Sequence, residues 1–395
     1  MKSIPVTIPY FDGKEAENVK KVLDSGWVAQ GPVVAQFEEA VCSCTTALHL
    51  AMAAEGLAAG MDVIVPAFTF VATANAAVET GAVPVFADIC QETFNIDTKH
   101  VRKIIEKDYT FDGGKLYNNE TKNVLWGIVP VHEFGLCCDI GEINRIAEEY
   151  HLKVIEDAAC ALGAKIGGTH QGGFGNTSCI SFHPRKSITT GEGGMVLTND
   201  AALAKRMKEL RTHGSTVSAD ARHAGKGFLL PEFPETGYNY RMTDIQAAVG
   251  MAQIEKLDQI VGEKRRRAAI YDKLIGQTLP EFRVPYVPEG YFHTYQSYVC
   301  MLDLEKLHLD SVELGGQFRN RLLSALEEAG VATRQGTHAV HMLGYYRDRF
   351  GYSPKDFPNA YACDHLSVTL PLYIQMSDDD QAYVVEKIRE TIDKL

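Results

Sequence analysis

Two residues of the chain carry reactive side chains in unusual sequence surroundings. Lys186 lies between the apolar residues 179–182 and a glycine-rich turn at 191–194, which would hold its amine at the end of a sheet. Asp157 ends the apolar run 153–156, where an unpaired carboxylate is costly and a cationic partner is expected. Alone, the lysine would be a solvated side chain and the aspartate a helix cap or the partner of an arginine. Together they indicate an amine nucleophile beside a buried carboxylate.

This pair predicts a site for pyridoxal phosphate, whose ring accepts electrons from a carbanion. Lys186 is the expected catalytic amine, which forms a Schiff base with the cofactor, and Asp157 would keep the pyridinium nitrogen protonated. Thr45 and Thr46 open a predicted helix, where backbone N–H groups, hydroxyls and the helix dipole would bind the phosphate. The same threonines also fit an ordinary helix start. Ser181 offers a further hydroxyl close to the lysine.

A sheet is needed to position these residues. Between residues 45 and 199 short apolar runs alternate with helical periodicity, which indicates an α/β fold with a mainly parallel sheet flanked by helices. Buried strands are predicted at 62–66, 83–87, 124–129, 153–156, 179–182 and 195–198. Helices are predicted at 45–56 and 140–150, and one long helix at 244–266 leads out of this unit.

The chain changes character after about residue 275. A strand at 297–302 and helices at 311–329 and 378–394 predict a smaller α+β domain. We therefore expect a large cofactor-binding domain over residues 1–255 and a small C-terminal domain over 256–395. Segments rich in glycine, asparagine and charge, at 112–123 and 215–227, are predicted to be surface loops.

Composition excludes several other classes of protein. The 395 residues are 45% hydrophobic and 23% charged, as in soluble globular proteins. The start of the chain does not resemble a signal peptide and no apolar run is long enough for a membrane span, so we expect a cytoplasmic protein without a membrane partner. The net charge of -12 disfavours nucleic acid as a partner. Nine cysteines without metal-ligand spacing predict reduced thiols, with neither a disulfide framework nor a metal site.

Five motifs in a fixed order carry a family resemblance. They are residues 45–50 (TTALHL), 65–70 (VPAFTF), 156–159 (EDAA), 181–186 (SFHPRK) and 237–244 (GYNYRMTD). With them, most of the chain resembles the fold type I pyridoxal phosphate enzymes of the DegT/DnrJ/StrS family. The resemblance implies a large domain with a seven-stranded, mainly parallel sheet. It also implies a transaminase of polysaccharide biosynthesis that moves an amino group, usually from L-glutamate, to a nucleotide-linked keto-sugar in a ping-pong reaction.

The resemblance also implies roles for single residues. Phe70 matches the aromatic that stacks on the cofactor ring, although alone it could be a core phenylalanine. Asn239, otherwise a plausible turn residue, matches the asparagine that reaches the phosphate of the neighbouring subunit, which implies a homodimer with shared active sites. Cys160 stands where the family often has glutamine or histidine near the cofactor's 3′-oxygen, and a thiol is a weak hydrogen bonder. Lysine at position 186 favours transamination, because a dehydratase branch has histidine there.

Substrate contacts are the least specified part of the prediction. His183, Arg185, Arg241 and His338 are candidates for binding the sugar hydroxyls or the diphosphate, and each also fits a structural role. A lyase or desulfurase on the same fold would keep Lys186 and Asp157 but act without a sugar acceptor. A non-catalytic regulatory protein with a vestigial site is the other alternative.

Two segments depart from the family pattern. In the family, a helix like residues 34–40 is followed by a further stretch with a short strand before the phosphate motif, whereas here Ala40 and Val41 run directly into Cys42. The segment 108–123 is longer than the resemblance implies. The first departure affects the expected phosphate loop, and the second lies elsewhere in the predicted large domain.

Overall fold

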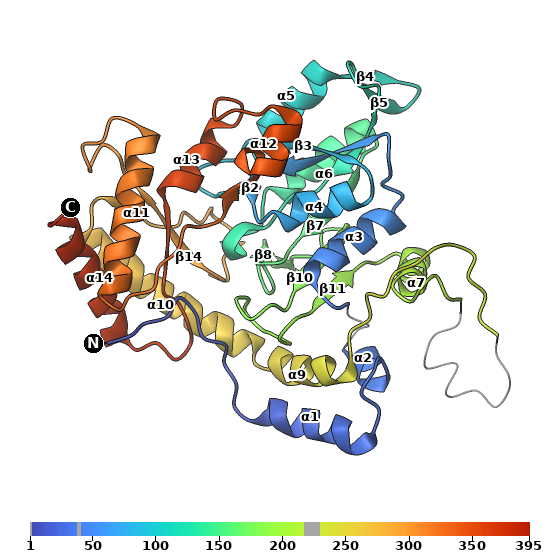
Figure 1. Cartoon of the computed structure of the whole chain (residues 1–395), viewed down its shortest axis with the longest axis horizontal. Helices are drawn as coiled ribbons and strands as arrows, with labels where there is room; N and C mark the ends of the chain where they lie inside the picture. Colours follow the sequence, from blue (N-terminus) through green and yellow to red (C-terminus); the bar gives the residue numbers. More distant parts are fainter. Residues whose placement is uncertain (1, 38–40, 217–229) are drawn as a thin grey trace.

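The computed structural model describes residues 2–37, 41–216 and 230–395. Its main sheet runs in the order β11-β10-β7-β6-β1-β3 (Figure 1). The strands are β1 (Met61–Pro66), β3 (Val83–Ala87), β6 (Val124–Ile128), β7 (Lys153–Asp157), β10 (Thr177–Ser181) and β11 (Gly194–Leu197). All neighbours along this path are parallel except β10 and β11. The predicted mainly parallel sheet is confirmed, and all six predicted strands form.

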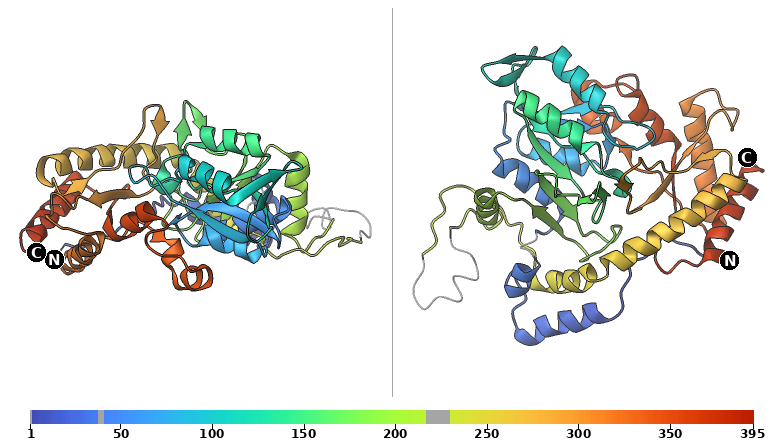
Figure 2. Two further views of the ribbon diagram at one scale, coloured as in Figure 1. Left: turned by 90° about the horizontal axis from the view of Figure 1, so that it is seen from above. Right: turned by 180° about the vertical axis from the view of Figure 1, so that it is seen from behind.

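Helices cover both faces of this sheet (Figures 1 and 2). One face packs against α3 (Cys44–Ala54) and α4 (Ala72–Glu79), with α7 (Ala201–Leu210) packed on α3, and the other face packs against α5 (Thr98–Asp108) and α6 (Ile140–Tyr150). Strand β1 shows the separation, because Val63 and Val65 belong to the core of the first face and Ile64 to that of the second. Burial on both faces explains why the strands read as continuous apolar runs.

The predicted loop over 112–123 is wrong in its first part. This segment begins in a hairpin of β4 (Tyr109–Asp112) and β5 (Lys115–Asn118), and β5 also pairs with β6, so that the sheet has eight strands rather than seven. Gly113 and Gly114 form the turn, both with positive φ. A two-residue hairpin turn requires positive φ at both central residues, which the Gly-Gly pair supplies without strain. The hairpin accounts for the extra length of segment 108–123.

The predicted long helix over 244–266 is two helices. α9 (Asp244–Ile254) ends before α10 (Leu257–Thr278) begins, and Lys256 lies at the break. This lysine is buried and contacts the carboxylates of Asp12 and Glu15, which lie beside and within α1 (Lys14–Ser25). Helical periodicity continues through the break, so only the contact with the N-terminal segment distinguishes the two helices.

The C-terminal part has its own antiparallel sheet, in the order β12-β14-β16. Its elements are β12 (Phe282–Arg283), β14 (Tyr298–Leu302), α11 (Val312–Glu328), β16 (Ser367–Leu370) and α14 (Asp378–Ile392). The predicted strand and both predicted helices are therefore present. The N-terminal end also packs here, because Ile4 bridges Val331, and both chain ends lie on this side of the molecule (Figures 1 and 2). The boundary between residues 255 and 256 falls between α9 and α10 and stays our prediction.

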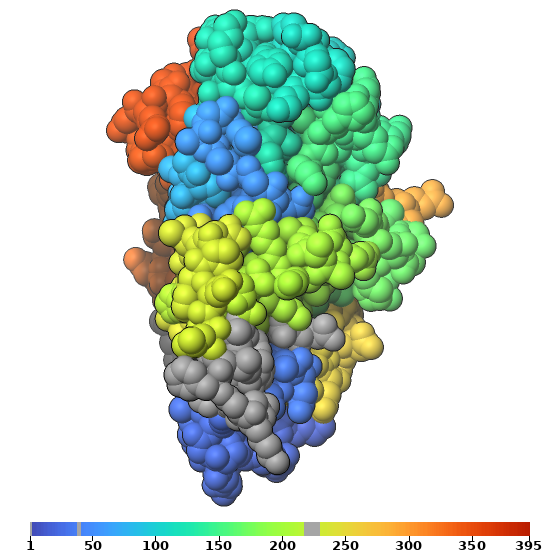
Figure 3. All heavy atoms as spheres, turned by 90° about the vertical axis from the view of Figure 1, so that its right-hand side faces the viewer, coloured from blue at the N-terminus to red at the C-terminus, as the bar shows by residue number. Residues whose placement is uncertain are grey.

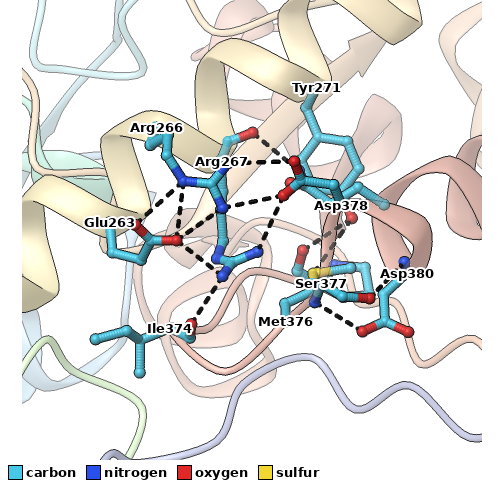
Figure 4. Close-up of polar contacts among 11 residues, drawn as sticks. Glu263, Arg266, Arg267, Tyr271, Ile374, Met376, Ser377, Asp378 and Asp380 are labelled. Atoms are coloured by element: carbon cyan, nitrogen blue, oxygen red, sulfur yellow. Dashed lines mark hydrogen bonds and ion pairs between the residues drawn. The ribbon is translucent and has the colours of Figure 1, made fainter.

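Polar contacts attach the last helix to α10 (Figure 4). Arg266 and Arg267 both pair with Glu263 on their own helix and with Asp378 at the start of α14. Arg267 also donates to the carbonyl of Ile374 at 2.9 Å. The buried side of α10 thereby fixes the loop between β16 and α14.

The remaining elements are short or connect the larger ones. They are α2 (Pro32–Gln36), β2 (Phe68–Thr69), η1 (Glu133–Gly135), β8 (Lys165–Ile166), β9 (Thr169–His170), β13 (Tyr291–Phe292), β15 (His338–Ala339), η2 (Val340–Met342), α12 (Gly344–Phe350) and α13 (Pro358–Leu366). From the side opposite the C-terminal sheet, the first helices lie at one end of the molecule and α5 with the β4–β5 hairpin at the other (Figure 3). Within the described residues, each helix is too short or too polar to cross a bilayer. The predicted loop at 215–227 lies almost entirely outside the described residues.

Candidate functional site

Lys186 and Asp157 both lie at the carboxyl ends of neighbouring parallel strands. Asp157 is the last residue of β7, and Lys186 follows the end of β10 by five residues. The register places Asp157 beside Cys179 of β10. Lys186 Nζ donates to Cys160 Sγ at 3.0 Å, and Cys160 follows Asp157 by three residues. The carboxyl edge of a parallel sheet is where such folds bind ligands.

Asp157 is buried and has two hydrogen-bond donors. Its Oδ2 accepts from the hydroxyl of Thr73 at 2.7 Å, and its Oδ1 accepts from the N–H of Ala159 at 3.1 Å. Burial raises the pKa of Asp157, although these donors and the nearby Lys186 favour the ionised form. The carboxylate would therefore gain from a further cationic or N–H partner, as the pyridinium of the cofactor would be.

Lys186 is half-buried beside a thiol. Burial opposes its ammonium form, but Cys160, Cys44 and Asp157 favour it, and the pKa of Lys186 stands above its usual value. Burial raises the pKa of the Cys160 thiol, so the sulfur is uncharged at neutral pH. The amine is thus held in the site by a weak acceptor that a ligand can replace.

The start of α3 is the segment predicted to bind the phosphate. Ser43 caps the helix, and the hydroxyl of Thr46 donates to the Ser43 carbonyl at 2.8 Å. Thr46 is therefore engaged in the helix cap, whereas the Thr45 hydroxyl has no hydrogen-bond partner among the described residues. A Cβ at Gly194 would lie 2.4 Å from the Ser43 carbonyl oxygen, so only glycine lets β11 approach this loop. Ser181 pairs with Gly194 across β10 and β11, which places its side of the strand at the loop.

The departure from the family pattern falls in the same region. Residues 38–40 lie outside the described residues, and the chain resumes at Val41. Val41 exchanges two backbone hydrogen bonds of 2.9 Å with Gly194 and also bridges Arg241. Cys42 donates its N–H to the carbonyl of Tyr240 at 3.0 Å. The segment before the phosphate loop is thus attached directly to β11 and to the 237–244 motif.

Two predicted residues, Phe70 and His338, lie next to each other at the paired strands β2 and β15. Phe70 follows β2 and is 62% exposed, and its carbonyl accepts from Thr73, the residue that contacts Asp157. His338 pairs with Thr69 across β15 and β2, and its Nδ1 is 2.8 Å from Gln335 Nε2. Strand pairing thereby brings His338 close to Phe70, although 268 positions separate them in numbering.

The other candidates lie at two different places. Around the lysine, burial lowers the pKa of His183, whose Nδ1 accepts from the Arg185 N–H at 3.2 Å, and Arg185 itself is exposed. Near the phosphate loop, Asn239 is exposed and its backbone bridges Thr212. Arg241 bridges Val41, so it lies at the entry to α3. The structure therefore groups His183 with Arg185, and Asn239 with Arg241.

Three residues that the sequence argument missed belong to this site. Thr73 contacts Asp157, Glu133 is buried near both Asp157 and Lys186, and Lys264 is buried near Lys186. Burial lowers the pKa of Lys264 to about 8, and its Nζ donates to the Gln296 carbonyl at 3.1 Å. Glu133 carried a usable signal, because it comes shortly after a buried strand, and Asp157 ends one. Thr73 and Lys264 lie in helices and carried none.

The donor set fits pyridoxal phosphate. It offers an amine on Lys186, a buried carboxyl on Asp157, a hydroxyl and N–H groups at the start of α3, and an exposed ring at Phe70. These are the groups that an aldehyde, a pyridine nitrogen, a phosphate and an aromatic ring require.

Comparison with known proteins identifies a family and relatives that match nearly the whole chain. A model of the DegT/DnrJ/EryC1/StrS aminotransferase family matches residues 9–389. The chain is 34% identical to the spore coat polysaccharide biosynthesis protein SpsC of Bacillus subtilis (strain 168), over 98% of this chain and 97% of that protein. It is also 34% identical to the GDP-perosamine synthase of Escherichia coli O157:H7, over 99% of both. Helicobacter pylori PseC, an aminotransferase involved in the biosynthesis of pseudoaminic acid, has a TM-score of 0.85 at 25% identity over 100% of both chains.

Proposed function

Because the chain belongs to the DegT/DnrJ/EryC1/StrS aminotransferase family, we propose that it moves an amino group from L-glutamate to a nucleotide-linked keto-sugar in a ping-pong reaction. Membership confirms the predicted resemblance, the fold type I architecture and the class of enzyme, a pyridoxal phosphate-dependent transaminase that acts on nucleotide sugars. The identity of the amino donor, the ping-pong order and the role of each residue are proposals.

One observation carries the proposal: Lys186 and Asp157 lie at the same edge of the sheet, close enough for each to affect the pKa of the other, and Lys186 Nζ contacts Cys160. When bound, the cofactor supplies a ring that accepts electrons from the substrate carbon. Asp157 holds the proton on the ring nitrogen, and its burial strengthens that contact. With the cofactor bound, the free amine of Lys186 would serve as the base that takes the proton from the substrate carbon and as the acid that gives it back.

Other residues of the chain would hold the cofactor in place. Thr45 and Ser181 bind the phosphate together with N–H groups at the start of α3, and Thr46 supports them through the helix cap. Phe70 covers one side of the ring. Asn239, exposed in the single chain, binds the phosphate of a partner subunit in a homodimer. That role makes each active site dependent on both subunits.

The acceptor is proposed from the cations around the site and from the relatives. His183, Arg185, Arg241 and His338 are basic side chains near the lysine, the phosphate loop and the ring site, and a sugar diphosphate needs such partners. One relative makes a GDP-linked amino sugar by its name, and another acts in polysaccharide biosynthesis. We propose a cytoplasmic enzyme that supplies an amino sugar for a surface polysaccharide such as an O-antigen.

Absorbance spectra test the proposed site directly. The purified protein with pyridoxal phosphate is expected to show the visible band of a lysine-bound cofactor, and L-glutamate is expected to convert it to the pyridoxamine form. Lys186→Ala should lose the lysine-bound band. Lys264→Met is the comparison variant, because Lys264 is a second amine near Lys186, and a band retained in this variant would assign the Schiff base to Lys186.

Each alternative predicts a different spectrum. Absence of the band in the protein as purified and after added cofactor would support a vestigial, non-catalytic site. A lyase or desulfurase would turn over an amino acid continuously without a sugar acceptor, whereas the proposed enzyme stops after one half-reaction. Restoration of the original band by a nucleotide-linked keto-sugar would establish the second half-reaction.

A further inference from the structure

Glu133 is a buried carboxyl of the cofactor site that neither the sequence motifs nor the proposed reaction uses. It follows β6 through residues 129–132, which run beside the end of β7: Val131 bridges Asp157, and the His132 N–H donates to the Asp157 carbonyl at 3.0 Å. The Glu133 N–H is held by the side chain of Asn95 at 2.9 Å. The fold therefore places Glu133 directly beside the residue expected to hold the ring nitrogen.

The backbone after Glu133 is constrained as well. Phe134 has φ 53, a left-handed conformation that is rare for a bulky side chain, and Gly135 has φ 105. A Cβ at Gly135 would lie 2.4 Å from the Thr294 hydroxyl, so this turn is packed tightly against the C-terminal part of the chain. Strained turns of this kind persist where the surrounding structure fixes them, commonly at functional sites.

The Glu133 side chain lacks a partner for one of its oxygens. Glu133 is 4% exposed, and its Oε1 forms no hydrogen bond with any described residue. A buried polar atom without a partner costs about 1–3 kcal/mol, so such an atom in a binding site indicates a ligand that completes it. The groups around the carboxyl are Asp157 on β7, Cys160 in the loop after β7, Lys186 in the loop after β10, and Thr69 on β2.

A small cavity opens on the other side of Glu133. It is lined in part by Glu92, Tyr286 and His293, which are the titratable groups of the elements packed there. Burial and, to a smaller extent, the nearby Arg265 lower the pKa of His293 to about 3, so this histidine is neutral at physiological pH.

At neutral pH Glu133 is a carboxylic acid. Burial and the neighbouring Asp157 raise the pKa of Glu133 to about 8, although Thr69 and Lys186 favour the ionised form. The protonated group has an O–H to donate, which a carboxylate lacks. Cys160, the neighbour of Lys186 Nζ, has only a weak S–H donor. The Glu133 carboxylic acid is thus a stronger hydrogen-bond donor near Lys186 than the Cys160 thiol.

We propose that Glu133 is a positioning residue that donates a hydrogen bond from its carboxylic acid to the bound cofactor, on the side of the ring next to Lys186. The inference rests on the proposed cofactor site and adds a residue to it. Glu133 would then supply the contact for which Cys160 is poorly suited, and the acid would be lost as a donor once it ionises.

Binding of pyridoxal phosphate to the apo-enzyme between pH 6.5 and 9.5, followed by visible absorbance, tests this role without relying on turnover. Glu133→Gln keeps a donor of similar shape and cannot ionise, whereas Glu133→Leu removes the donor. Below pH 8 we expect the wild type and Glu133→Gln to bind with similar Kd and Glu133→Leu about tenfold more weakly. Above pH 8 the wild type should weaken relative to Glu133→Gln, because its donor is titrated.

Glu92→Gln is the matched control, since Glu92 lines the same cavity and its Cys90 contact holds the pKa of that carboxyl below its usual value. This variant should follow the wild type at every pH. If wild type and both Glu133 variants bind and titrate alike, the inference about Glu133 is overturned while the cofactor site stands. If the wild type forms no lysine-bound cofactor at all, the proposed site and this inference fail together. If Glu133→Leu does not fold, the divergence of Glu133→Gln from wild type above pH 8 decides.

Discussion

The two acidic residues at the end of β7 differ sharply, although they are adjacent in sequence. Glu156 is completely buried and accepts hydrogen bonds from His132 Nε2 at 2.9 Å, Asn176 Nδ2 at 3.0 Å and the Gly172 N–H at 3.2 Å. Asp157 has only Thr73 and the Ala159 N–H as donors. Successive residues of a strand face opposite sides of a sheet, so the two carboxyls lie in separate environments.

On the Glu156 side of β7, the chain itself supplies the hydrogen-bond donors that the carboxylate needs. The N–H of Cys138 donates to Nδ1 of His132 at 3.1 Å, so Nδ1 carries no proton and the ring proton lies on Nε2, where it bonds Glu156. Burial opposes ionisation of Glu156, but these donors outweigh it and hold its pKa below the usual value. On the other side, burial dominates and the pKa of Asp157 is raised.

This difference separates stability from function on one strand. A buried carboxylate with enough donors stabilises the fold, while one with too few is kept for a ligand that brings the missing partner. Glu133 belongs with Asp157 by this criterion, since its pKa is also raised and one of its oxygens is without a partner among the described residues. A substitution at Asp157 should therefore lower activity more than stability, and a substitution at Glu156 should lower stability more than activity.

Asp157→Asn should have the largest effect, and on activity. We expect kcat/KM to fall roughly 100- to 1,000-fold, the scale for loss of a key electrostatic contact in a buried site. The free energy of unfolding of the apo-protein should stay equal or rise slightly, because a carboxyl with a raised pKa is removed. Kinetics and urea denaturation of the same preparation measure both. A large loss of stability with activity retained would reverse the assignment of the two sides.

Glu156→Gln should mainly affect stability. Its amide nitrogen would face groups that only donate, so the free energy of unfolding should fall by on the order of 2–3 kcal/mol, while kcat of the folded enzyme changes little. Since the pKa of Glu156 is lowered in the folded protein, the advantage of the wild type is complete above the usual value of 4.5 and decreases as the pH falls through the folded pKa. Denaturation curves at several pH values check the sign.

Thr73→Val tests how far the Thr73 hydroxyl stabilises the ionised form of Asp157. Without this hydroxyl the pKa of Asp157 should rise further, and we expect kcat/KM to fall about tenfold, as for one hydrogen bond to a charged group. The acidic limb of the pH profile should move to higher pH, since more Asp157 is protonated. Thr80→Val is a suitable control, because Thr80 is a threonine at the other end of α4 whose hydroxyl donates to the Ala77 carbonyl at 2.8 Å. An unshifted acidic limb in Thr73→Val would argue against Asp157 as the titrating group.

Asn176→Ala should give the smallest effect. It removes one of the donors to Glu156, which corresponds to about 1 kcal/mol of stability. Catalysis should not change, because Asn176 lies on the side of β7 away from Lys186. Thermal denaturation and steady-state kinetics make the comparison. A reduced kcat would show that the two sides are coupled through the strand.

Local sequence patterns determined most of the fold and the chemically essential part of the site. Apolar runs bounded by turn residues predicted the six strands of the main path, because a strand buried on both faces must be apolar throughout. The same reasoning predicted Asp157 and Lys186, since a charged residue at the end of such a strand needs a partner. The roles assigned to Lys186, Asp157 and all the other candidate site residues stay predictions.

Only the tertiary structure decided which distant residues complete the site. Pairing of β15 with β2 brought His338 beside Thr69, and packing of α4 brought Thr73 to Asp157. The break between α9 and α10 at Lys256 likewise depends on contacts with the N-terminal segment. Hydrophobic periodicity reports whether a residue is buried but not what it is buried against. Sequence alone therefore did not distinguish Glu156 from Asp157. The two residues are adjacent at the end of one strand, and the hydrogen-bond donors that distinguish them come from other parts of the chain.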